Sequence, residues 1–303
     1  VIMRAMWMLS GSYNIPNVNA MGKLVYTNNP AGGAARGAGP PQVTFALESA
    51  MDMLAEKIGM DPLRFRKINS LLPGQSVSTG MVYEQWPFPE LCDAIQAKYD
   101  SAKKEAATLK SGPIKRGVGI ATHAFGIGGP GDAGRVAVEL DPDDGITIYA
   151  AVADPGEGND SMLTQIASHL TGIPMDKVRL MTRDTDHTAE MGPAAASRMT
   201  YMAGGSLVLA IEQLKKAMDE AGVKTYEGLT KAGKPIHYVG SKKAAGQEGP
   251  LDPVTGQGPS FESRVHNIQM AEVDVNTDTG EVQVIKMTTA VDAGTVINPQ
   301  NLE

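Results

Sequence analysis

The chain has 303 residues, of which 42% are hydrophobic and 20% charged, with a formal net charge of −7 and a pI near 5.3. This composition predicts a globular protein with a sizeable core, and it implies neither a disordered nor a membrane protein. The acidic balance, without a cluster of Lys or Arg and with few aromatic residues, argues against a nucleic-acid-binding surface. We therefore expect a mildly acidic cytoplasmic protein.

The cysteine content limits which metal centres this chain can build. Cys92 is the only cysteine, so a disulfide framework, a CxxC metal site and an iron–sulfur cluster are all excluded for this chain alone. The first residues, VIMRAMWMLSG, contain an apolar run that resembles part of a signal segment, but the run is short and Arg4 interrupts it. We interpret this beginning as the interior of a domain.

The first third of the chain contains a conspicuous loop. Residues 23–27, KLVYT, alternate polar and apolar side chains, which predicts a strand. Residues 29–42, NPAGGAARGAGPPQ, are mostly Gly, Ala and Pro around one charge, Arg36. A lone guanidinium in a small-residue loop suggests recognition of an oxo or phosphate group. Composition alone fits an ordinary strand-to-helix connection as well.

Helices are predicted after this loop. Residues 43–58 carry apolar side chains at helical spacing and end at Gly59, which predicts one buried stripe. Asp61 and Pro62 have the residue types of an N-cap and a first helical position. Residues 70–80 are expected to form a loop and residues 89–109 another helix, which Gly112 and Pro113 end. We place a subdomain boundary there, between segments 1–112 and 113–303.

Strands dominate the next segment. Residues 116–123, 135–140 and 146–152 read as strands, with a turn at 141–145, and their succession predicts an antiparallel sheet. The sequence FGIGGPG between the first two strands lacks the G-x-G-x-x-G spacing and no helix follows it. This excludes the Rossmann and P-loop interpretations.

Two later junctions have the pattern of anion sites at helix N-termini. Residues 154–173 run from a Gly-containing turn into a helix, for which Asp160 or Ser161 is the expected cap, and free N–H groups there suggest an anion site. A well-capped helix after a tight turn explains the pattern equally. Residues 194–200, AAASRMT, precede a second helix predicted from about 201 to 221, whose apolar face consists of Leu207, Ala210, Ile211 and Leu214. His187, with Asp184 and Asp186 nearby, lacks enough neighbouring ligands to predict a metal site.

The remaining segments complete the expected fold. Residues 178–181 are predicted as a strand, residues 224–260 as a polar surface insertion, and residues 265–275 and 281–291 as a hairpin. Together these elements predict an α+β protein in which mixed and antiparallel sheets pack with helices in two subdomains.

The order of these motifs resembles that of a known family. Residues 34–71, AARGAGPPQVTFALESAMDMLAEKIGMDPLRFRKINSL, resemble the molybdenum-binding part of the xanthine dehydrogenase and aldehyde oxidoreductase family, and most of all its bacterial aldehyde oxidoreductases. There an arginine, glycines and a Pro-Gln pair precede such a helix and a DPL-x-x-R-x-x-N segment. The likeness runs from Arg4 to the final VDAGTVINPQNLE, so the chain is identified as a central section of such a subunit.

The resemblance implies a molybdenum hydroxylase that oxidises aldehydes to carboxylic acids with water as the oxygen donor. The alternative is a xanthine or N-heteroaromatic dehydrogenase subunit. It also implies molybdopterin cytosine dinucleotide carrying molybdenum, which no side chain of this chain ligates directly, and 2Fe-2S clusters on another domain or subunit. The expected partners are that iron–sulfur part and the remainder of the molybdenum-binding subunit, in a homo-oligomeric parent, with no nucleic acid and no membrane.

The family's functional positions can be carried onto this sequence by motif. Arg4, which precedes the YNIPN motif at residues 13–17, would steady negative charge on the substrate. Arg36 is expected at the metal face, and a purine-selecting phenylalanine is replaced by alanine two residues after it, which favours aldehydes. The turn of Gly156, Glu157 and Gly158 matches a family G-Q-G turn, with Glu157 as the departure. The complete expected sets are catalytic Arg36, Arg4 and Glu157, and cofactor-binding Gly37, Ala38, Gly156, Gly158, Ala195, Ala196, Ser197 and Thr200.

One catalytic group expected from the family has no counterpart here. The glutamate that acts as base in the family lies further downstream, in a G-E segment, and is not found in this chain. This departure leaves a second hypothesis, that the chain is a catalytically inactive fragment, either excised or one part of a split enzyme.

Overall fold

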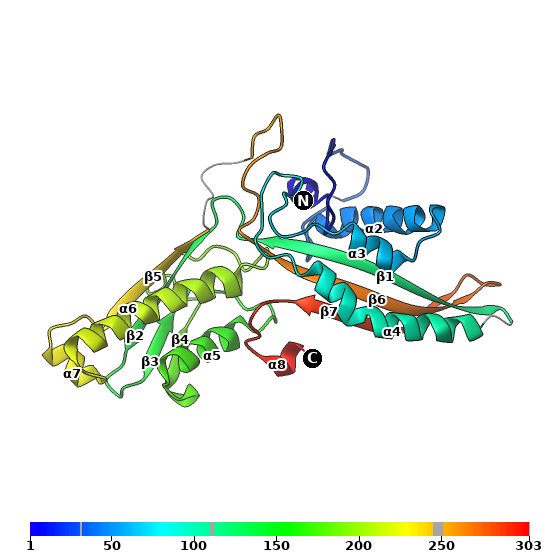
Figure 1. Cartoon of the computed structure of the whole chain (residues 1–303). Coiled ribbons are helices and arrows are strands. Elements are labelled where there is room, and N and C mark those ends of the chain that lie inside the picture. Colours follow the sequence, from blue (N-terminus) through cyan, green and yellow to red (C-terminus); the bar gives the residue numbers. More distant parts are fainter. Residues whose placement is uncertain (31, 110–111, 245–250, 303) are drawn as a thin grey trace. The chain divides into compact units, whose positions relative to one another are not determined.

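The computed structural model describes residues 1–30, 32–109, 112–244 and 251–302. Two compact units result (Figure 1): unit 1 comprises residues 1–126 and 250–294, and unit 2 comprises residues 127–249 and 295–303. This grouping differs from the expected division at residue 112, because the segment that follows continues in unit 1 and a late hairpin returns to it. The α+β fold class, with mixed sheets packed with helices, is confirmed.

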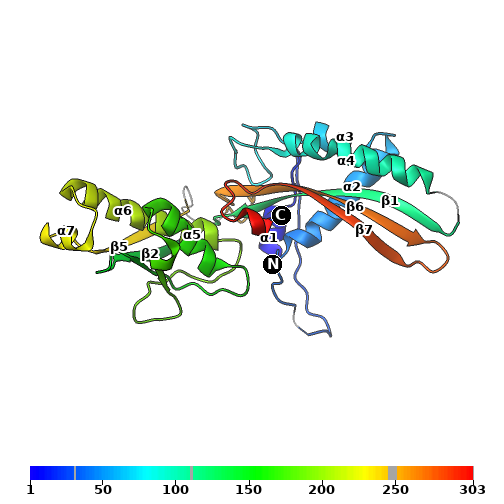
Figure 2. The same ribbon diagram turned by 90° about the horizontal axis from the view of Figure 1, so that it is seen from below.

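Unit 1 combines helices with a three-stranded sheet. Its helices are α1 (Ile2–Trp7), α2 (Pro40–Lys57), α3 (Pro62–Ile68) and α4 (Phe88–Thr108). The sheet has the order β1-β6-β7, with β1 (Ile114–Ile127), β6 (Ser263–Asn276) and β7 (Val282–Asp292). β6 and β7 form the expected antiparallel hairpin, which carries an irregularity between Glu272 and Val273. Figure 2 shows α4 running along this sheet, and α4 contacts β6 and β7.

The core of unit 1 lies where α4 meets the sheet. Leu63, Phe88 and Ile268 have no exposed surface, and Ile95 and Tyr99 are almost as buried. The α4 residues among them, Phe88, Ile95 and Tyr99, are seven and four positions apart, which puts them on one helical face. Asp61 caps α3 as expected, because its Oδ1 accepts hydrogen bonds from the N–H groups of Leu63 and Arg64.

Unit 2 contains a four-stranded mixed sheet of order β4-β3-β2-β5. β2 (Ala133–Leu140) pairs antiparallel with β3 (Ile146–Tyr149) and with β5 (His237–Lys243), whereas β3 pairs parallel with β4 (Val178–Met181). The parallel pair requires a crossover, which α5 (Asn159–Thr171) and the short 3-10 helix η1 (Met175–Lys177) supply. The remaining helices are α6 (Gly205–Ala221), α7 (Tyr226–Lys231) and α8 (Pro299–Leu302).

Helix α6 is preceded by a π-helical turn, η2 (Met199–Gly204), so the helical backbone begins slightly before the predicted position. The expected face of α6 is buried, with Leu207, Ala210, Ile211 and Leu214 each at most 1% exposed. α6 packs on β2 and β5, and α5 packs on α6. The apolar face of α5 is buried as well, since Leu163 and Ala167 belong to the same core.

Several sequence predictions are wrong. Residues 23–27 form no strand, and Leu24 and Tyr26 are exposed, because no partner strand pairs with them in the described structure. β1 does not join the sheet of β2 and β3 but pairs within unit 1, so neighbours in sequence lie in different sheets. Residues 224–260 are not simply a surface insertion, since they contain α7 and the sheet strand β5. Leu54 on α2 and Ile58 at its C-cap are 48% and 58% exposed, so the buried stripe of this helix contains fewer residues than predicted.

Candidate functional site

The Arg36 loop ends in an unusual backbone conformation. Gly37, Ala38 and Gly39 have φ values of +98°, +36° and +106° directly before α2 begins at Pro40. Two glycines make such a run possible, whereas Ala38 adopts a left-handed conformation that a Cβ disfavours. A Cβ added to Gly39 would lie 2.4 Å from the carbonyl oxygen of Val1, so the loop end packs against the first turn of α1. The exposed Arg36 is thus carried by a loop whose end is fixed.

Arg4 lies on α1 and is half-buried rather than a snorkelling surface side chain. Its Nη2 donates a hydrogen bond to the carbonyl oxygen of Gly126 at 3.0 Å. The guanidinium also lies over the rings of Phe125 and Phe261, at 5.2 and 5.3 Å from their centroids. The positive charge of Arg4 is therefore held in a defined place in unit 1, on the helix that contacts the end of the Arg36 loop.

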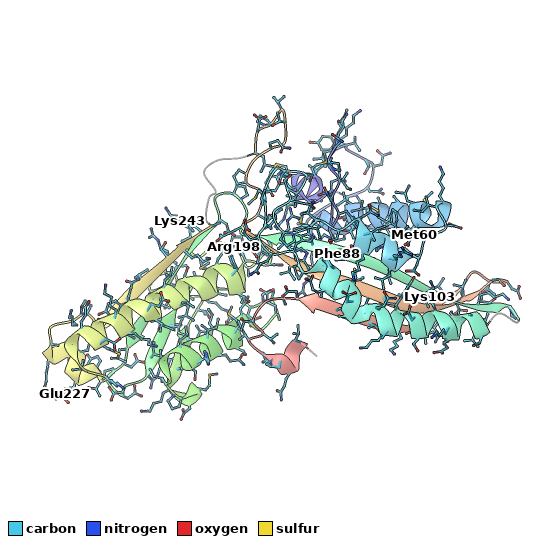
Figure 3. All side chains as sticks on the ribbon, viewed as in Figure 1. Met60, Phe88, Lys103, Arg198, Glu227 and Lys243 are labelled. Carbon is cyan, nitrogen blue, oxygen red and sulfur yellow. The ribbon has the colours of Figure 1, made fainter. Side chains whose placement is uncertain are left out.

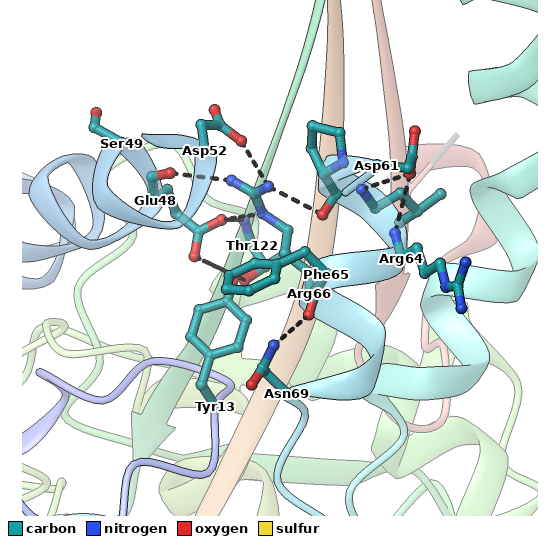
Figure 4. Close-up of polar contacts among 12 residues, drawn as sticks. Tyr13, Glu48, Ser49, Asp52, Asp61, Arg64, Phe65, Arg66, Asn69 and Thr122 are labelled. Atoms are coloured by element: carbon teal, nitrogen blue, oxygen red, sulfur yellow. Dashed lines mark hydrogen bonds and ion pairs between the residues drawn. The ribbon is translucent and has the colours of Figure 1, made fainter. Parts of the chain in front are cut away.

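A buried polar network anchors α2 (Figure 4). The Glu48 carboxylate accepts hydrogen bonds from the Tyr13 hydroxyl at 2.6 Å, from Arg66 Nε at 2.8 Å and from the Thr122 N–H at 2.9 Å. Arg66 is fully buried and also pairs with Asp52 at 2.7 Å. Burial and the Glu48 charge raise the pKa of Tyr13 well above its ordinary value, so the phenol stays a donor.

This network connects four segments of unit 1. Tyr13 begins the YNIPN motif, Glu48 lies on α2, Arg66 is the arginine of the DPL-x-x-R motif on α3, and Thr122 lies on β1. Removing Arg66 would leave the buried Glu48 carboxylate without a counterion, which is strongly destabilising, whereas removing Glu48 would leave Arg66 paired only with the more exposed Asp52. Sequence reasoning missed the role of Glu48, although its helical spacing from the buried Met51 and Ala55 places it on the inward face.

The turn before α5 is closed by a carboxylate of the chain itself. Asp154 Oδ1 accepts hydrogen bonds from the N–H groups of Gly156 and Gly158 at 2.9 and 3.0 Å, and its Oδ2 accepts one from Asp160 N at 3.3 Å. These bonds, that from Gly158 foremost, lower the pKa of Asp154. The expectation of free N–H groups here is therefore wrong, and so is the expected cap at Asp160 or Ser161, because Gly158 occupies the N-cap position.

Glu157 is exposed and held by its own turn. Its Oε1 accepts a hydrogen bond from Asn159 Nδ2 at 2.6 Å, and the same amide donates to the carbonyl oxygen of Ala153 at 2.8 Å. Asp160 nearby pairs with Arg183 at 3.1 Å. With three carboxylates around it, this turn is unsuited to a phosphate, although a Cβ added to Gly156 or Gly158 would meet no atom within 4 Å and the backbone remains open to close approach.

The loop before η2 differs from the turn before α5, because two of its backbone N–H groups have no acceptor within the described part of the chain. Ala196 and Ser197 have φ values of +61° and +57°, and within the described part of the chain neither N–H group donates a hydrogen bond. Ala195, Ala196, Ser197 and Thr200 are all exposed. Successive backbone N–H groups in left-handed conformation, beside a hydroxyl and a helix N-terminus, form a concavity suited to an anionic oxygen group. These residues fit an anionic oxygen group such as a phosphate.

Arg198 holds this loop in place through hydrogen bonds of its guanidinium group. Sequence reasoning did not single out this residue. It is 5% exposed, and its Nε donates to Asp132 Oδ1 at 2.8 Å, while Nη1 donates to the carbonyl oxygens of Met191 and Pro193. In Figure 3 it lies at the far end of unit 2 from Glu227, at the beginning of the long helical segment. Lys242 places a further positive charge there, 4.4 Å from the centroid of the Tyr201 ring.

Other site types are not found in the described ranges. No group of three or more His, Cys, Asp or Glu side chains that could hold a metal was found there, and His187 Nδ1 lies 3.0 Å from Asp184 Oδ2. None of the helices described is long and apolar enough to cross a bilayer. Unit 1 has a cavity of about 640 Å³ whose lining is uncharged, formed by residues 14–19, 75–78 and Gln257.

Comparison with known proteins agrees with this geometry. A family model described as the molybdopterin cofactor-binding domain matches residues 94–303, and a second model of the same description matches residues 1–70. The chain therefore belongs to the molybdopterin cofactor-binding domain family, and the expected relation to molybdenum hydroxylases is confirmed. The sequence is 37% identical to aldehyde oxidoreductase of Megalodesulfovibrio gigas over 98% of this chain and 33% of that protein.

Further relatives include a solved structure. The fold matches aldehyde oxidoreductase from Desulfovibrio desulfuricans with a TM-score of 0.93 and 32% identity, over 98% of this chain and 33% of that one. A probable xanthine dehydrogenase subunit of Bacillus subtilis is 28% identical over 96% of this chain and 42% of its own length. The chain thus spans about a third of the length of the aldehyde oxidoreductases that it matches.

Proposed function

We propose that this chain is part of a molybdenum-dependent oxidoreductase that converts aldehydes to carboxylic acids, with water as the oxygen donor. The observation that carries the proposal is the match to two aldehyde oxidoreductases over 98% of the chain. Ala38 adds support at the residue level, because a small side chain after Arg36 leaves no ring on which a purine could stack. Relatives named for xanthine dehydrogenase activity favour an N-heteroaromatic substrate as the second candidate.

The residues proposed to bind the cofactor would have different roles. In unit 2, Ala195, Ala196, Ser197 and Thr200 would hold the phosphates of molybdopterin cytosine dinucleotide through N–H and hydroxyl donors. Gly156 and Gly158 would let the backbone approach the metal end, while Asp154 keeps their N–H groups fixed. In unit 1, Gly37 and Ala38 would shape the loop that presents Arg36.

The cofactor would supply the two-electron redox chemistry, and the chain's own residues would bind and orient the substrate. Arg36 and Arg4 would stabilise the negative charge that develops on the aldehyde oxygen, because guanidinium donors fixed before the reaction need no reorganisation. Glu157, fixed by Asn159, would act as a hydrogen-bond acceptor beside the metal face. The glutamate that acts as base would come from outside this chain.

The same proposal includes partners and location. Electrons would leave through 2Fe-2S clusters on another domain or subunit, since Cys92 is the chain's single cysteine and is buried. The remainder of the molybdenum-binding subunit would complete the pocket, in a homo-oligomeric parent enzyme. The proposed location is the cytoplasm.

The test is Arg36→Ala in the complete enzyme, with Arg64→Ala on α3 as the control. Both side chains are exposed, so neither substitution should change folding. We expect kcat/KM for aldehydes to fall about 100-fold for Arg36→Ala, as for loss of one oxyanion donor, and to stay unchanged for Arg64→Ala. Equal kcat/KM in the two variants would remove Arg36 from the site. Cofactor content, measured in parallel, separates lost catalysis from lost binding.

A further inference from the structure

Arg264 on β6 is a buried arginine without a counterion. The residue is 8% exposed, and in the described structure no carboxylate lies within ion-pair distance of its guanidinium. Nη1 makes a long hydrogen bond of 3.4 Å to the carbonyl oxygen of Ala124, and the group lies over the rings of Tyr83 and Phe261. Nε and Nη2 are buried and meet no acceptor. A buried charge with unused donors is costly, so this arrangement calls for an explanation.

The two unused atoms form one edge of the guanidinium. The N–H bonds of Nε and Nη2 point in the same direction and can hold both oxygens of a carboxylate through parallel hydrogen bonds. Arg116 on the neighbouring strand β1 shows this use: its Nε and Nη2 donate to the two oxygens of Asp274 at 2.7 and 2.8 Å.

The other buried arginines also direct Nε to a carboxylate, whereas their Nη2 atoms donate to backbone carbonyl oxygens. Arg66 directs Nε to Glu48, and Arg198 directs Nε to Asp132, each at 2.8 Å. Arg264 has the same edge, at least as well shielded from solvent as that of Arg116, but nothing occupies it in the described structure. The unoccupied edge therefore has the shape and charge of a carboxylate site.

The surroundings of Arg264 supply further polar atoms rather than a competing anion. His266 lies two residues along β6, hence on the same face of the strand, and its Nδ1 is buried without a partner. The Nε2 atom of His123 on β1 is likewise buried and has no hydrogen-bond partner in the described structure. Burial and the charge of Arg264 lower the pKa of both rings to about 4, so both are neutral at pH 7. Asp292, opposite His266 on β7, is exposed and accepts from Gly294 N.

We propose that the Nε–Nη2 edge of Arg264 binds a carboxylate group that the described residues do not provide. The group is either a small free carboxylate or an Asp or Glu side chain from a part of the full-length protein outside these 303 residues. Two charge-assisted hydrogen bonds to the edge would satisfy both donors and neutralise the buried charge. This proposal does not depend on the proposed function.

The experiment follows the Arg264 Nε–H resonance of the 303-residue chain by NMR, with sodium formate titrated against sodium chloride at constant ionic strength. We expect a saturable shift for Arg264 with formate and none with chloride, while the Arg116 resonance stays in place. Formate should also raise the Tm of the wild type and of Arg116→Lys, but not that of Arg264→Lys, because an ammonium lacks the planar two-donor edge. The NMR arm uses only the wild type, so misfolding of a variant cannot obscure it.

The same titration on the full-length gene product distinguishes the two sources. A formate response that persists there supports a free carboxylate. A resonance that is already shifted there, and no longer responds to formate, supports a carboxylate side chain of the protein. Absence of a saturable response in the 303-residue chain, or an equal response to chloride, would mean that Arg264 is satisfied by a buried water only and would overturn the proposal.

Discussion

Single side chains in this protein fix loops that would otherwise be mobile. Asp154 closes the turn before α5 with three hydrogen bonds, and Arg198 holds the segment before η2 through Asp132 and two carbonyl oxygens. Because both loops are short and rich in Gly and Ala, side-chain bonds replace the core packing that such sequences cannot provide. Each candidate loop of unit 2 is therefore preorganised before any ligand binds.

A pH dependence of stability follows from His266. Its folded pKa of about 4 lies below the unfolded value near 6.5, so the unfolded state binds a proton first as the pH falls. The stabilising contribution of the neutral ring is complete above about pH 6.5 and is lost as the pH falls toward about 4. Between pH 7.5 and 5.5 the loss from this one group is on the order of 1 kcal/mol.

The substitution His266→Gln removes this titration. We expect urea unfolding to show a smaller loss of stability for the variant than for the wild type between pH 7.5 and 5.5, even though its stability at pH 7.5 is reduced. His169→Gln serves as the control, since His169 on α5 is exposed, and we expect its curve to follow that of the wild type. Parallel curves for His266→Gln and the wild type would contradict the assignment.

Among the elements, β5 shows how closely helix and sheet pack in unit 2. A Cβ added to Gly240 would lie 1.9 Å from the carbonyl oxygen of Ser206 and 2.6 Å from Ala210 N, both in the backbone of α6. Glycine is required here because the helix backbone touches the strand. Ser206 adds a polar connection, donating to the Gly134 carbonyl on β2 and accepting from Lys242 N on β5.

The substitution Gly240→Ala should therefore destabilise unit 2 strongly. Either α6 or β5 must move, which we expect to cost at least about 2 kcal/mol in the free energy of unfolding. Gly119→Ala on β1 is the matched control, because its added Cβ meets no atom within 4 Å, and its effect should be close to zero or slightly stabilising. Equal denaturation midpoints for the two variants would show that β5 does not pack as described.

At the scale of the whole molecule, the residues proposed to bind the cofactor and substrate lie largely in exposed loops. Arg36, Glu157, Ser197 and Thr200 are all exposed, and the aldehyde oxidoreductase relative is about three times as long as this chain. A ligand held by loops alone stays largely solvated, so its affinity should be weak.

We therefore expect the purified 303-residue chain to fold, to carry less than stoichiometric molybdenum and to lack aldehyde:dye reductase activity, whereas the complete enzyme folds, carries the metal and turns over. Circular dichroism, elemental analysis and a dye-reduction assay check these outcomes. Turnover by the chain alone, free of any co-purifying subunit, would contradict both the inactive-fragment hypothesis and the placement of the base glutamate outside it.

The sequence by itself determined the local elements and the family. The cap of α3 at Asp61, the stripe of α6 and the hairpin of β6 and β7 depend on residues a few positions apart, so periodicity and turn chemistry predict them. The motifs from Arg4 to the C-terminus also identified the family, although the roles of Arg36, Glu157 and the 195–200 segment stay predictions.

Only the tertiary structure decided which distant groups meet. Three features depend on segments that lie far apart in the chain or are buried together only after folding. They are the pairing of β1 with β6, the burial of Glu48 against Arg66, and the unoccupied Nε–Nη2 edge of Arg264. Single-residue patterns cannot predict such contacts, because burial, which makes an ion pair or an unpaired donor important, exists only once the sheet and helices have packed.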